Sequence, residues 1–305
     1  MTVDLNVTEE VPEYMYPSFF TRYKLRFRHF LGLFIDSSFG LLGAYIVLFF
    51  IIIALFAPSL APYNPNKSDL EARYQDPTVL HPLGTDRIGR DILSQIIYGS
   101  QASLIIGLTA AFISVVIGSL FGLLAGYYGG WIDTLLMRTT DFFIQIPVFP
   151  LMLIAVALFG GTMENLILVI GLLGWTGTAR MVRSETLSLK ERAFVEATRS
   201  IGATDRYIIF IHILPNVFPL VFANMTLNIV DAIISEAGLS FLGFGVADVW
   251  SWGRVLHEAQ KELAMLKGAW WHWFVPGMCI MFLALGFALI SFGLNEILNP
   301  RLRRR

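Results

Sequence analysis

The 305-residue sequence has little sulfur chemistry and little charge. It contains one cysteine, Cys279, which excludes an intrachain disulfide. Charged residues make up only 15% of the chain, and 22 basic side chains nearly balance 23 acidic ones. A formal net charge of −1 provides no basic surface for a nucleic acid, so we expect no nucleic-acid partner.

Motifs of several enzyme classes are also missing. No G-x-x-x-x-G-K-[ST] segment occurs, so we expect no P-loop nucleotide site, and His257-Glu258 does not continue into H-E-x-x-H. No G-x-S-x-G nucleophile turn is present. His81, Asp86 and Asp91 match no compact ligand spacing. The sequence therefore predicts no catalytic residue, no metal site and no cofactor in this chain.

Hydrophobic residues are abundant instead, at 55% of the chain with a mean hydropathy of +0.64. They fall in long uncharged runs, and a membrane-spanning helix needs roughly 20 apolar residues. In lipid the backbone must satisfy its own hydrogen bonds, so these runs predict an all-α membrane protein with about six transmembrane helices. The predicted spans lie near residues 40–58, 102–126, 139–159, 163–180, 212–234 and 275–294.

The distribution of Lys and Arg predicts the orientation of these spans. With an inner N-terminus, fifteen of the 22 basic residues fall in inner segments and seven in outer loops. Both termini are therefore predicted to be cytoplasmic. Residues 19–31 mix aromatic and basic side chains, a pattern typical either of a helix in the inner interface or of a simple charged flank.

A polar island at residues 180–206 interrupts the apolar runs on the predicted inner side. Ser188 and Glu191 form an S-x-x-E capping box, which predicts a helix over 189–201. Gly202 is suited to end this helix in a left-handed conformation. Thr204 can then cap the next helix. The island is predicted to be a helix, a tight turn and a second helix.

The predicted helix 189–201 is amphipathic. Its apolar stripe consists of Leu189, Ala193, Phe194, Ala197 and Ile201. Charged side chains lie on its other faces, and the small alanines allow close approach of another surface. The stripe can pack either on the chain's own bundle or on a separate partner, and the pattern alone leaves both alternatives open.

The island also resembles a known motif. Glu196-Ala197-Thr198, followed by Gly202 and Pro215, resembles the EAA motif of ABC-importer permease subunits. In that family this loop is a coupling helix that docks on the ATP-binding cassette. The resemblance implies the type I importer permease fold, with ATP and magnesium held by a separate ATPase. It also implies ATPase coupling through a set of five residues: Ala193, Glu196, Ala197, Arg199 and Gly202.

Longer stretches narrow the resemblance. HPLGTDRIGRDILSQIIYGSQASL (81–104), AGYYGGWIDTLLMRTTD (125–141) and SEAGLSFLGFG (235–245) resemble the C-type permeases of the dipeptide/oligopeptide/nickel group. This implies a prokaryotic plasma-membrane importer with a second permease, one or two kinds of ATPase subunit and an extracytoplasmic substrate-binding protein. Peptides are the implied substrate, with oligosaccharides or nickel as alternatives; a stand-alone secondary transporter or a membrane scaffold is a weaker hypothesis.

The resulting division has four parts: a cytoplasmic N-terminal tail (1–36), a first span with its outer loop (37–101), a permease core (102–295) and a basic cytoplasmic tail (296–305). Within the core, Asp231 and Glu236 are ionisable groups in an apolar helix, where charge is costly. Asp231 is a candidate for the translocation path, where it could meet an amino group. Glu236 is a candidate for the path or for a structural role at the outer gate.

Two further patterns concern helix shape. Gly118, Gly122 and Gly126 recur every four residues and predict one small face for close packing. Pro147 and Pro150 predict a kink in the third span, and Pro215 and Pro219 predict a break at the start of the fifth.

Overall fold

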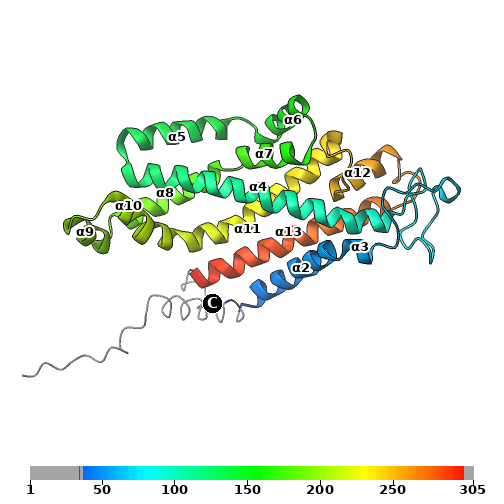
Figure 1. The fold of residues 1–305 in the computed structure, drawn as a ribbon, viewed down its shortest axis with the longest axis horizontal. Coiled ribbons are helices and arrows are strands. Elements are labelled where there is room, and N and C mark those ends of the chain that lie inside the picture. The colour runs from blue at the N-terminus through cyan, green and yellow to red at the C-terminus, as the bar shows by residue number, and fades with distance from the viewer. Residues whose placement is uncertain (1–33, 35–36, 299–305) are drawn as a thin grey trace, which may run out of the picture.

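A computed structural model describes Phe34 and residues 37–298 of the chain. Within these residues the fold consists of helices joined by turns and loops, as the sequence predicts (Figure 1). The predicted interfacial helix at 19–31 lies outside the described residues, as do residues 299–305 of the predicted basic tail.

Four helices are long and apolar enough to cross a membrane, and two bent helix pairs raise the number to as many as six. The first and last spans, α2 (Ser38–Leu55) and α13 (Trp271–Leu298), pack side by side. The helices of the bundle are α2, α3 (Ala57–Leu60), α4 (Ile92–Tyr128), α5 (Gly130–Gln145), α6 (Val148–Phe159), α7 (Met163–Leu173), α8 (Thr176–Lys190), α11 (Leu214–Leu239) and α13.

The bundle has two distinct ends (Figure 1). At one end, called here the α9 end, lie the short helices α9 (Ala193–Ser200) and α10 (Asp205–Tyr207), the start of α2 and the last turns of α13. At the other end, called the cap, lie residues 61–91 with the 3-10 turn η2 (Leu70–Ala72), and residues 245–270 with α12 (Trp252–Lys261). The hydroxyl of Ser37 donates to the carboxylate of Glu296 at 3.1 Å and holds the start of α2 against the end of α13.

The third predicted span is broken rather than gently kinked. α5 and α6 meet at an angle of 85°, and Pro147 stands at the break as the N-cap of α6. Proline fixes its own φ and disfavours the α conformation in the residue before it, so Ile146 is extended. The fourth predicted span bends by 41° between α7 and α8.

The fifth span differs from its prediction in both length and continuity. It runs from Asp205 to Phe244, continuous until a kink at Gly243 (φ +92°), and begins seven residues earlier than predicted. The expected break is replaced by a π-helical segment, η3 (Ile208–Ile213), directly before Pro215. Proline has no N–H for the preceding turn, and a wider π turn accommodates that loss without ending the helix. A second π segment, η4 (Ser240–Phe244), follows α11.

The predicted small-residue face is confirmed on α4. A methyl group on Gly118 would lie 2.6 Å from the Trp175 carbonyl oxygen. On Gly122 it would lie 2.6 Å from the carbonyl oxygen of Ala179. Glycine therefore lets α4 and α8 approach at backbone contact, the mode of packing that small residues allow in lipid.

Polar side chains hold the cap onto the bundle. Trp252 is buried and donates its indole N–H to the Ile96 carbonyl at 3.0 Å. Asp86, also buried, accepts from the side chains of Arg90 and Gln95. His81 lies 2.9 Å from Asp91. The carboxylates of Asp86 and Asp91 thus have hydrogen-bond partners within the chain. Residues 37–298 contain no cluster of three or more His, Cys, Asp or Glu side chains that could hold a metal ion.

Candidate functional site

The polar island forms a helix and a turn as predicted, but its first helix starts later. Ser188 lies inside α8, which runs on to Lys190, and α9 begins at Ala193 with Arg192 as an N-cap that makes no side-chain bond. The predicted capping box and the 189–201 bounds are therefore wrong. Leu189 is buried against the α4–α8 core, and that packing extends α8 through the local start signal.

The end of α9 follows its prediction closely. Gly202 has φ +85°, the left-handed conformation, and its N–H bonds to the Arg199 carbonyl at 3.0 Å. The N–H of Ala203 reaches the Thr198 carbonyl at 3.3 Å. Together these two bonds make a Schellman end. The Thr204 hydroxyl accepts from Tyr207 N–H at 3.4 Å and begins α10, which confirms the second cap.

α9 turns Val195 inward and four members of the predicted apolar stripe outward, whereas the fifth member, Leu189, lies in α8 and is buried. Val195 is fully buried, whereas Phe194 is 40% exposed and Ile201 is 84% exposed. Ala193 and Ala197 are exposed as well, as are Glu196, Arg199 and Gly202. Packing on the chain's own bundle therefore rests on Val195, which the predicted stripe did not include. The stripe itself is left as a small exposed surface with an acid and a base beside it.

Tyr127, at the end of α4, anchors this segment and was not singled out from the sequence. Its hydroxyl donates to Asp205 at 2.6 Å. The ammonium of Lys190 lies 5.7 Å from its ring centre, and the guanidinium of Arg199 lies 6.0 Å from it. One buried aromatic ring thus links α8, α9 and α10 to the longest helix. The only sequence signal was its position in the stretch 125–141.

A cavity of about 570 Å³, lined by both polar and apolar side chains, lies at mid-bundle. Its walls come from α4, α6, α7, α8 and α11. Asn224 and Asn228 of α11 line it, and both donate side-chain N–H groups to the Thr178 hydroxyl, at 3.1 and 3.2 Å. Asp231 lies one turn further along the same helix and is the only ionisable residue among the described residues that line this cavity.

The two candidate carboxylates in α11 have different surroundings. Asp231 lines the cavity, whereas Glu236 does not. Glu236 is buried and accepts from the hydroxyls of Ser240, at 2.7 Å, and Ser103, at 3.4 Å. It therefore joins α11 to α4 near the cap.

Asn224 and Asn228 were not singled out from the sequence, although the spacing 224, 228, 231 places three polar groups on one helical face within an apolar run.

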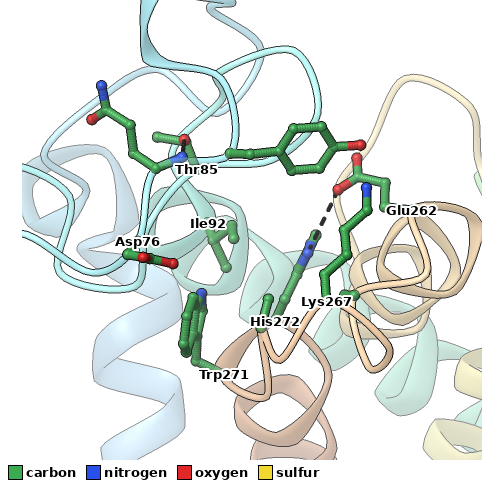
Figure 2. Close-up of a pocket in the computed structure, with 11 residues that line it drawn as sticks. Asp76, Thr85, Ile92, Glu262, Lys267, Trp271 and His272 are labelled. Carbon is green, nitrogen blue, oxygen red and sulfur yellow. Dashed lines mark hydrogen bonds and ion pairs between the residues drawn. The ribbon is translucent and has the colours of Figure 1, made fainter.

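A second, smaller cavity of about 250 Å³ lies within the cap, between residues 74–85 and the start of α13. Figure 2 shows the imidazole of His272 directed at the carboxylate of Glu262, and the two groups are 3.8 Å apart. Glu262 is buried and accepts from the backbone N–H of Arg87 at 3.1 Å. Burial raises the pKa of Glu262 from 4.5 to about 7.

Comparison with known proteins identifies the architecture. Residues 118–304 match the family described as "Binding-protein-dependent transport system inner membrane component". Residues 27–77 match "N-terminal TM domain of oligopeptide transport permease C".

Relatives align with most of the chain. It is 35% identical over 268 residues to the "Dipeptide transport system permease protein DppC" of Alkalihalophilus pseudofirmus, which covers 88% of this chain and 87% of the relative. It is 34% identical to the protein of the same name from Bacillus subtilis, covering 88% and 83%. It is also 34% identical to the "Glutathione transport system permease protein GsiD" of Pectobacterium atrosepticum, covering 90% and 91%.

The first family match takes in α9, the α12 part of the cap and every residue that lines the mid-bundle cavity except Ser114. The chain therefore belongs to the family of inner membrane components of binding-protein-dependent transport systems, as a multi-pass permease subunit of a bacterial ABC importer whose ATPase is a separate subunit.

Proposed function

We propose that this chain forms half of a translocation pathway for peptides, and that α9 is the coupling helix on which its ATPase docks. The exposed stripe of α9 carries this proposal. A short helix that leaves Ile201 84% exposed, and Phe194 40% exposed beside His212, presents a surface suited to a groove on a partner. Docking is assigned to Ala193, Glu196, Ala197, Arg199 and Gly202, all of them exposed.

In this arrangement the α9 end faces the cytoplasm and the cap faces outward. The sequence supports this orientation, because fifteen of the 22 basic residues fall in the segments predicted to be on the inner side. Because α2 begins and α13 ends at the α9 end, both termini are then cytoplasmic (Figure 1). The division into tail, first span with outer loop, permease core and basic tail is kept as part of the proposal.

The mid-bundle cavity is the proposed path through this subunit. A lone carboxylate among amides and hydroxyls suits the ammonium group of a peptide, because Asp231 can accept a charge-assisted hydrogen bond. Glu236 is instead assigned to the outer gate, where its bonds to Ser103 and Ser240 hold α11 against α4. A second, homologous permease would close the other side of the path.

The substrate class rests on the relatives, which are named for dipeptide and glutathione transport. Peptides are therefore preferred to oligosaccharides or nickel. The complete importer would contain this chain, a second permease, one or two kinds of ATPase subunit and an extracytoplasmic binding protein.

Site-directed cross-linking tests the docking of α9. The background is Cys279→Ser, which removes the single cysteine. Ala197→Cys on that background should cross-link to the ATPase in purified complex, and the yield should change when ATP is added. Val79→Cys, 99% exposed in the cap, is the matched control and should not cross-link to it. A complex that retains its ATPase but gives no cross-link from residue 197 would disprove the docking assignment.

Uptake by the reconstituted complex tests the path. ATP-driven uptake of a labelled tripeptide should fall about tenfold in Asp231→Asn, because one charge-assisted hydrogen bond is lost. Cross-linking at residue 197 should be unchanged in the same variant. Unaltered tripeptide uptake by Asp231→Asn would exclude this residue from the path.

A further inference from the structure

A separate pocket of about 200 Å³ lies beside η4 and α12 in the cap. It is called here the Arg254 pocket. One wall carries the charged side chains Arg254, Glu258 and Lys261. Ser240 and Gly243 of η4, with Gly245 just after it, close the other side. The imidazole Nδ1 of His257 lies 2.8 Å from the Phe241 carbonyl, which can only accept, so His257 fixes the wall of the pocket.

Arg254 lacks the partner that such a group normally has. It is half-buried, yet no carboxylate within the described residues lies within 4.0 Å of it, and its Nη1 is buried without a hydrogen-bond partner. The partly buried Arg90 and Arg183, by contrast, pair with Asp86 and Asp133. A buried donor without an acceptor is costly, and a guanidinium most readily satisfies it with a carboxylate.

Charged groups of both signs surround the Arg254 guanidinium. The Arg254 guanidinium lies 4.3 Å from the centre of the Trp250 ring, and that of Arg90 lies 4.7 Å from the same ring. The carboxylate of Glu258 pairs with Arg90 at 3.7 Å. Burial is the largest influence on the pKa of Arg254 and lowers it; the charge of Glu258 raises it, that of Arg90 lowers it, and that of Asp248 raises it. An added anion would relieve this unfavourable desolvation.

The pocket stands beside the helices that form the mid-bundle cavity. η4 continues directly from α11, and nine residues of helix separate Asp231 from Ser240, a rise of about 13 Å. The turn between α6 and α7 reaches the same segment, since a methyl group on Gly161 would lie 2.7 Å from the Gly245 carbonyl oxygen. Both spaces are thus flanked by α11 and by the α6–α7 hairpin.

We propose that the Arg254 pocket is a carboxylate-binding subsite at the outer mouth of the pathway, where it receives the terminal carboxylate of the substrate. The inference rests on the proposed peptide import and adds a residue that discriminates among substrates. From the mouth inward, a cation at Arg254 is followed by an anion at Asp231. This order favours a zwitterion whose ammonium end enters first.

Transport of a matched peptide pair tests the subsite. Trialanine has a free carboxylate, whereas trialanine amide has none. With each peptide preloaded on the binding protein, Arg254→Gln should lower uptake of trialanine about tenfold and leave that of the amide unchanged, because only trialanine loses a bond to a charged donor. Arg254→Lys should restore part of the loss, and Lys267→Gln, a cap cation outside this pocket, should change neither.

An equal loss for both peptides, or no loss for either, would overturn the proposal. The first result is expected if Arg254 only maintains the fold or contacts an acidic side chain of the binding protein. If the wild-type complex imports neither peptide, the proposed function of peptide import is wrong. Carboxylate binding at Arg254 is then tested by a binding measurement on the wild-type complex, which requires neither transport nor a variant.

That measurement is protection from phenylglyoxal, which modifies arginine, with the labelled residues quantified by mass spectrometry on wild-type complex without binding protein. Trialanine should protect Arg254 and trialanine amide should not, while exposed Arg73 serves as the internal control. Equal labelling of Arg254 with and without trialanine would rule out carboxylate binding here.

Discussion

Substitution of Gly202 isolates the contribution of one backbone conformation to coupling. A methyl group at this position would meet nothing within 4 Å, so the cost of a side chain comes from φ +85° alone. For residues other than glycine the left-handed conformation costs about 1–2 kcal/mol, with Asn tolerated better than most. A cost of this size shifts a local equilibrium roughly 5- to 30-fold.

The expected consequence is loss of the Schellman end of α9. When residue 202 relaxes to negative φ, the Ala203–Thr198 bond opens and Ile201 moves with the last turn. α9 has only eight residues and little stability of its own. Uptake per ATP hydrolysed should therefore fall in the order Gly, Asn, Ala, Val, while membrane insertion and the amount of assembled complex stay unchanged.

The assay is peptide uptake and phosphate release measured together in proteoliposomes. Gly277 provides the matched control, because it too has open space around a missing side chain but lies within α13 without a positive φ. Gly277→Val should transport normally. Normal coupling in Gly202→Val, or a loss that is equal in the Asn and Val variants, would refute the reasoning.

Three further predictions concern stability, each measured by thermal or denaturant unfolding of the purified complex. The pKa of Glu262 is about 7 in the folded protein, against an ordinary value of 4.5 for a glutamate side chain. Because the folded state binds this proton more tightly than the unfolded state, the free energy of unfolding should fall as pH rises from 4.5 through 7, by at most about 3 kcal/mol. Glu262→Gln should flatten that slope, and an unchanged slope would contradict the assignment. Gly122→Ala should destabilise by about 1–3 kcal/mol, because its methyl group would lie 2.6 Å from a backbone oxygen of α8, whereas Gly277→Ala should be neutral. Trp252→Phe should cost about 1 kcal/mol through loss of the bond to the Ile96 carbonyl, and a Tm equal to that of the wild type would show that this bond contributes nothing.

The sequence was most informative where structure depends on local chemistry. Gly202 and Thr204 were predicted as helix caps because each acts within four residues, and both do so. The glycine face of α4 was predictable for a similar reason, since its period is that of a single helix. Hydropathy located the membrane-spanning regions because burial in lipid depends mainly on composition.

Prediction failed where a distant contact decides the outcome. Ser188 and Glu191 carry a helix start signal, but the burial of Leu189 keeps α8 intact through that point. Proline at 215 predicted a break, yet the residues before it widen into a π turn instead. The role of Asn224 and Asn228 depends on Thr178 of α8, a residue 46 and 50 positions away in sequence to which both amides donate.

The π-helical segment Ile208–Ile213 has a mechanical consequence. It lies between α9 and the cavity-lining part of α11, so it is one connection through which a movement of α9, the proposed docking helix, would reach the cavity; α8, which also lines the cavity, is another. A π turn holds one residue more than the α turn it replaces. Conversion of this segment to α geometry would shift the preceding helices, α9 and α10, by one residue relative to α11. That shift is a rotation of roughly 100° around the α11 axis and a translation of about 1.5 Å along it. The π segment can thus connect α9 to α11 in two helical registers. A small displacement of α9 can twist this segment before it moves the part of α11 that lines the cavity.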